Sequence, residues 1–63
     1  MKEENRGKLY KLCEDYMRHC NFRHELYAHN LLIGDNVFEE MMGWIDEDIK
    51  DIVDKIQKTV DEE

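Results

Sequence analysis

The chain of 63 residues contains no proline, only three glycines and two cysteines. Hairpin-rich β folds use glycine and proline at their turns, so this scarcity argues against a β-rich architecture. Small secreted domains rely on several disulfides, which two cysteines cannot supply. On one helix Cys13 and Cys20 would lie about 10.5 Å apart at a rise of 1.5 Å per residue, whereas a disulfide needs roughly 4.4–6.8 Å between Cα atoms. Two free thiols favour a reducing, cytoplasmic setting.

The chain also lacks any apolar run close to the roughly 20 residues that a membrane-spanning helix needs. Its first residues, MKEENRGK, are polar and no apolar stretch follows them, so we expect no signal peptide. Both features favour a soluble protein without membrane contact.

Positive charge is scarce in the second half of the chain. Residues 31–63 carry three lysines against eleven acids, a net charge of −8, and residues 1–30 carry six basic against five acidic residues, a net charge of +1. Nucleic-acid binders present a basic stripe that displaces counterions, so direct binding to nucleic acid is not expected. The acidic half is predicted to be attracted to a basic protein surface instead.

A turn is expected at residues 33–36, where the sequence reads IGDN. Gly34 can take the left-handed conformation that ends a helix, and Asp35 or Asn36 can then cap the next one. Asn36 with Glu39 also fits a capping-box pattern. We expect a second helix over residues 37–60, because apolar residues recur there every three or four positions. These residues are Phe38, Met42, Ile45, Ile49, Ile52, Ile56 and Val60.

The first helix is expected over about residues 4–32. Asn21 could divide it and cap a shorter third helix, but the apolar stripe passes through Asn21 without changing face, which favours a continuous helix. This stripe consists of Leu9, Cys13, Tyr16, Cys20, His24, Tyr27 and Leu31. We therefore predict one all-α domain over residues 1–63, an antiparallel helical hairpin with a short acidic tail at 61–63.

Apolar residues outside the two stripes gather mostly near the turn. They are Leu12, Phe22, Leu26 and Ile33 in the first helix and Val37 and Trp44 in the second. At 100° per residue they lie roughly 80–160° from the centre of their stripes. A lone hairpin would leave them in water as one patch, and such patches mark partner surfaces. We expect two hairpins to pack their turn-proximal halves into a two-fold symmetric four-helix bundle, or the patch to bind another protein.

The segment RHELYAHN, residues 23–30, looks like the His-Glu-x-x-His motif of zinc proteases. His24 and His29 are five residues apart instead of four, so on a helix their rings point about 140° apart and cannot share one ion. Cys20 and His24 have helical spacing and leave open a zinc site completed by a second copy. Instead of a zinc ligand, we favour the interpretation that His24 is hydrogen-bonded at an interface. No nucleophile–base pair, phosphate-binding loop or basic patch is apparent, so no enzymatic activity, catalytic residue, metal or cofactor is expected.

These features favour a small acidic regulatory or adaptor protein that binds itself and another protein, of a kind typical of phages and other mobile elements. The expected apolar anchors are Trp44, Met41, Phe22, Leu26 and Val37, and the acids expected to select a basic partner are Asp46, Glu47, Asp51 and Asp54. Two alternatives stay open: an inhibitor that mimics DNA with its acids, and an antitoxin-like partner. Mimicry would weaken steeply with salt, whereas an interface anchored by aromatic residues would not.

Overall fold

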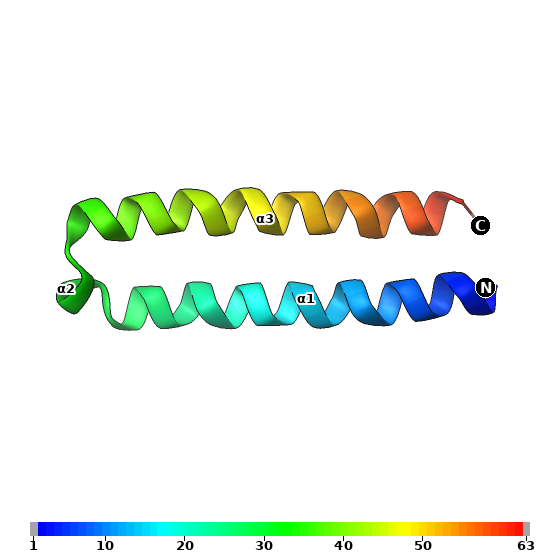
Figure 1. The fold of residues 1–63 in the computed structure, drawn as a ribbon, viewed down its shortest axis with the longest axis horizontal. Helices are drawn as coiled ribbons and strands as arrows, with labels where there is room; N and C mark the ends of the chain where they lie inside the picture. Colours follow the sequence, from blue (N-terminus) through cyan, green and yellow to red (C-terminus); the bar gives the residue numbers. More distant parts are fainter. Residues whose placement is uncertain (1, 63) are drawn as a thin grey trace.

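A computed structural model describes residues 2–62 of the chain, which form two long antiparallel helices joined by a short helical turn (Figure 1). Helix α1 spans Glu3–Ala28, the short α2 spans Asn30–Ile33, and α3 spans Asp35–Asp61. The Cα atoms extend over 45 × 14 × 10 Å, so the molecule is a single layer of helices. The prediction of an all-α chain with two long helices packed on each other is confirmed. We call the end that carries α2 the turn end and the opposite end the open end.

Helix α1 runs without interruption through Asn21, so the alternative in which this residue divides the first helix is wrong. The helix ends at Ala28, four residues before the expected end at Leu32, because the backbone leaves the helical region at His29 (φ −116°, ψ 20°). The amide of His29 still donates to the carbonyl of Glu25 at 3.1 Å, which closes the last turn. The single turn of α2 then carries the chain across to α3.

Gly34 joins α2 to α3 and has φ 90° and ψ 149°. The positive φ was expected, but the ψ value places Gly34 in an extended region open essentially to glycine only, rather than in the left-handed helical region. Its carbonyl accepts from the amide of Phe38 at 2.9 Å, so α3 begins at Asp35. Asn36 therefore lies inside the first turn, and no side chain caps the helix. The prediction that Asp35 or Asn36 caps this helix is wrong.

Helix α3 packs through nearly the face that its sequence predicts. Phe38, Met42, Ile45, Ile49, Ile52 and Ile56 are all buried or half-buried. The exception is Val60, which is exposed, and Thr59 occupies the packed position in its place. Thr59 can be buried because its hydroxyl donates to the carbonyl of Lys55 at 2.8 Å, which satisfies the polar group.

Helix α1 packs through a face rotated by roughly 80° from the predicted stripe, counting 100° per residue. Five members of that stripe are exposed instead, namely Cys13, Tyr16, His24, Tyr27 and Leu31. The buried or half-buried residues of α1 are Asn5, Leu9, Leu12, Asp15, His19, Cys20 and Leu26. Four of these follow a spacing of seven, which is two helical turns and keeps side chains on one side of a packed helix pair.

The tightest packing lies near the turn end. Leu26, Met42 and Ile45 form a small buried cluster, and Ile33, Phe38, Met41 and Ile49 pack against it half-buried. No large side chain of the described residues is fully buried. The core is therefore a narrow seam between α1 and α3, and it leaves the two broad sides of the layer open to solvent.

Candidate protein-binding surfaces

Contacts across the seam define two broad faces of the hairpin. On one side the Arg23 Nη1 atom lies 3.2 Å from Asp46 Oδ1. On the other side His19 Nε2 lies 3.7 Å from Asp48 Oδ2. Asp46 and Asp48 are two residues apart, about 200° around α3, so they flank the seam on opposite sides. We call these the arginine face and the histidine face, and residues three, four or seven positions along either helix can be assigned to them.

The histidine face carries a group of apolar side chains near the turn end. Phe22 belongs to it, because Phe22 lines one hollow together with His19 and Ile45. Trp44 precedes Asp48 by four residues and Met41 precedes it by seven, so both lie on the same side of α3. We define the tryptophan patch as Phe22, Val37, Met41 and Trp44. Trp44 is 61% exposed, Val37 48% and Phe22 44%, so all three present apolar surface to solvent, whereas Met41 is half-buried.

Acidic residues surround Trp44 on α3. Glu40 lies four residues before it, and Glu47, Asp48 and Asp51 lie three, four and seven residues after it. Of the acids expected to select a partner, Glu47 and Asp51 are thus neighbours of the patch. Asp54 lies ten residues after Trp44 and faces away from the seam. Asp46 lies on the arginine face and is engaged by Arg23.

Leu26 was expected as an exposed anchor beside Phe22, and that expectation is wrong. It is 4% exposed and packs against Met42 and Ile45 in the buried cluster. The reason is its place seven residues after His19 and fourteen after Leu12 within α1, which puts it in the seam. In this conformation Leu26 offers no surface to a partner.

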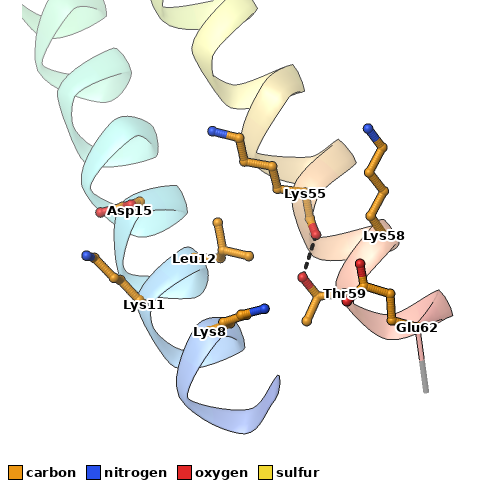
Figure 2. A pocket seen from close by; sticks show the side chains of 8 residues that line it. All are labelled: Lys8, Lys11, Leu12, Asp15, Lys55, Lys58, Thr59 and Glu62. Carbon is orange, nitrogen blue, oxygen red and sulfur yellow. Dashed lines mark hydrogen bonds between the residues drawn. The ribbon is translucent and has the colours of Figure 1, made fainter. Parts of the chain in front are cut away.

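A groove of about 420 Å³ opens on the histidine face at the open end. Its lining residues are Lys8, Lys11, Leu12 and Asp15 from α1 and Lys55, Lys58, Thr59 and Glu62 from α3. We call it the lysine groove. Figure 2 shows Lys8 and Lys55 reaching over the gap between the helices on either side of Leu12, while Lys11 and Lys58 lean outward. The sequence pattern does not predict this grouping of four lysines, which shares the groove with Asp15 and Glu62.

The arginine face carries a second apolar strip. Cys13, Cys20 and Tyr27 are spaced by seven, and Tyr27 meets Phe38 edge-on with ring centroids 5.5 Å apart. From α3 come Val53 and Val60, seven and fourteen residues after Asp46, both nearly half exposed. Both cysteines are free thiols. This strip contains much of the stripe that the sequence predicted for packing within the hairpin.

The three histidines lie apart from one another. His19 donates through Nδ1 to the carbonyl of Asp15 at 2.7 Å, and His29 Nε2 lies 3.2 Å from Glu25 Oε2. His24 is exposed in the single chain. Across residues 2–62 no three histidine, cysteine or acidic side chains converge as metal ligands would. No helix within this range has the length and apolar character needed to cross a membrane.

Comparison with protein-family models, with curated proteins and with solved structures finds no match for this chain. Its role has to be inferred from its own surfaces. The two that stand out are the tryptophan patch and the lysine groove, which share one face and lie at its opposite ends.

Proposed function

We propose that this protein is a non-enzymatic regulatory or adaptor module that acts by docking its tryptophan patch onto another protein molecule. The observation that carries this proposal is the exposure of Trp44, Phe22 and Val37 together on one face. Tryptophan is among the residues most enriched at binding hot spots, and aromatic residues in general are enriched at interfaces. Contiguous exposed apolar side chains of this kind mark interaction sites on soluble proteins.

The carboxylates around Trp44 indicate the chemistry of the partner. Glu47, Asp48 and Asp51 would lie at the rim of the contact, where charges steer association and reject wrong partners more than they add affinity. The complementary surface is an apolar pocket bordered by lysine or arginine. Because the apolar anchors supply most of the affinity, binding should weaken only modestly as salt increases.

Mimicry of DNA by the acids of α3 is the weaker proposal. A mimic needs a continuous negative surface that stands in for phosphates. On the histidine face the acids near Trp44 give way to four lysines at the open end. On the arginine face Asp46 is engaged by Arg23. Neither broad face is continuously acidic.

The test uses immobilised protein in an extract of the cells that express it. Trp44→Ala removes the main anchor, and Tyr10→Ala is the matched control because Tyr10 is a 72% exposed aromatic residue outside the patch. We expect the wild type and Tyr10→Ala to retain the same bound protein, including at raised salt, and Trp44→Ala to lose it. Identical bound proteins for both variants would contradict the proposal. Far-UV circular dichroism of each variant checks that the helices remain folded.

A further inference from the structure

The tryptophan patch and the lysine groove of one chain are complementary to each other. We propose that the patch of each hairpin docks into the groove of a second copy, so that two hairpins pack antiparallel through their histidine faces. This inference rests on the proposed function of the patch and names its partner. The resulting dimer contains the same contact twice.

The placement of the two sites on α3 permits this arrangement. Trp44 and Lys55 are eleven residues apart, about 16.5 Å along the helix, and they lie on either side of the middle of α3. A two-fold axis that crosses both helices at mid-length turns the second hairpin end for end. Trp44 of each copy then lies over the region of Lys55 in the other. Such an interface is isologous, the commonest form of protein dimer.

The groove provides both apolar walls and positive charge, which suit the Trp44 side chain and the carboxylates around it. Leu12 and the aliphatic stems of the lysines form apolar walls for the ring. The ammonium groups of Lys8 and Lys55 make no salt bridge within the described residues, so they are available to the face of Trp44 and to the acids beside it. The groove has four lysines against two acids, a net charge of +2. The side chains around Trp44 carry the opposite sign.

Charge also argues against the parallel alternative, in which the turn ends of two copies pack on each other. Two hairpins packed in parallel along their whole length would set the two lysine grooves together and the two acid-ringed patches together. Like charges placed opposite one another across an interface disfavour the arrangement that brings them together. The antiparallel arrangement replaces both repulsions with attractions.

The size of the face is adequate for a reversible dimer. Each broad side extends over 45 × 14 Å between Cα atoms, which is about 630 Å² per copy before side chains are added. Specific protein interfaces bury roughly 800 Å² per partner, and weaker ones somewhat less. The proposed dimer therefore falls within the ordinary range.

The test is analytical ultracentrifugation of the purified protein over a range of concentrations. Trp44→Ala removes the anchor, and the double change Lys8→Glu with Lys55→Glu reverses the net charge of the groove. Lys50→Glu is the control, because Lys50 lies on the outward side of α3 away from the groove. We expect a wild-type dimer, a dissociation constant raised at least tenfold in the patch and groove variants, and little change in Lys50→Glu. Circular dichroism confirms that each variant is helical.

Mixing the two impaired variants gives a sharper result. A heterodimer of Trp44→Ala with the groove variant keeps one intact contact, between the wild-type Trp44 of one copy and the wild-type groove of the other. The mixture should therefore dimerise better than either variant alone. A groove variant that dimerises as strongly as the wild type, or a mixture no better than its components, would overturn the inference.

The same measurements separate this inference from the proposed function. If the wild type stays monomeric while Trp44→Ala still loses a protein from the extract, the groove is not the partner and the proposed function stands. If Trp44→Ala dimerises as the wild type does and retains the same proteins from the extract, both proposals fail.

Discussion

Replacing Leu26 by alanine tests where the seam runs. The side chain is 4% exposed and packs against Met42 and Ile45. Removing a buried leucine side chain costs about 2–5 kcal/mol. The lower part of that range, about 2–3 kcal/mol, applies here because a single layer of helices lets neighbouring side chains and water close the gap. At about 0.05–0.15 kcal/mol per residue, the whole chain is stable by only about 3–9 kcal/mol. Leu26→Ala should therefore remove a large share of the stability.

Leu31→Ala is the matched control, because it makes the same chemical change at a side chain that is 95% exposed. Its expected effect is within about 0.5 kcal/mol, as for most surface substitutions. Urea denaturation followed by far-UV circular dichroism gives both free energies, with all samples at one protein concentration because association would add to stability. A cost for Leu31→Ala equal to or above that for Leu26→Ala would refute the seam described here and restore the stripe predicted from the sequence.

Other substitutions follow from the same structure. Gly34→Ala should lower the free energy of unfolding by about 1–3 kcal/mol, because its φ of 90° strains any side chain; Gly7→Ala should raise it by about 0.5–1 kcal/mol, since an added Cβ meets nothing within 4 Å inside α1. Urea titrations compare the two, and a stabilised Gly34→Ala would contradict this account of the turn. Arg23→Ala should cost less than about 1 kcal/mol by the same assay, because the Arg23 side chain and its carboxylate partner are 44% and 55% exposed; a loss above about 2 kcal/mol would be unexpected. Cys13, which is exposed, should be alkylated faster than the half-buried Cys20 in timed mass spectrometry, and the reverse order would count against the orientation of α1.

The sequence was sufficient to predict α3 because that helix has one dominant apolar series. From Phe38 to Ile56 the apolar side chains repeat with intervals of four and three, and acids occupy most of the outward positions. Only the last member, Val60, was misplaced, because Thr59 can be buried through its bond to a backbone carbonyl. A threonine whose hydroxyl bonds a carbonyl of its own helix can be buried, and a pattern of apolar residues does not predict that.

The face of α1 could not be predicted in the same way, because this helix carries two series with a spacing of seven. The packed series contains Asn5 and His19, and the other, mostly exposed series contains Cys13, the half-buried Cys20 and Tyr27. Counting apolar residues favours the exposed series. His19 is tolerated in the seam because its Nδ1 atom donates to the carbonyl of Asp15. That contact forms only once α1 is folded, because it joins residues one helical turn apart.

Of the two candidate surfaces, one could be predicted from the sequence and the other could not. The excess of apolar residues near the turn is visible in the sequence, and four of the five expected anchors do lie on one face. The lysine groove is not visible, because Lys8 and Lys55 come from opposite ends of the chain and meet only when the two helices lie antiparallel in one register. A composition that is acidic as a whole conceals such a local basic site.

In a molecule whose core is a narrow seam between two helices, the helices should separate progressively from one end. Each pair of facing turns on α1 and α3 adds its own small increment to the free energy of unfolding. Local unfolding should therefore begin at the open end and advance towards α2. Amide protons beside Leu26 and Met42 should then exchange last, and those near Asn5 and Thr59 first. Stability would also follow length: removing seven residues from both helices at the open end would lower it, and adding seven would raise it.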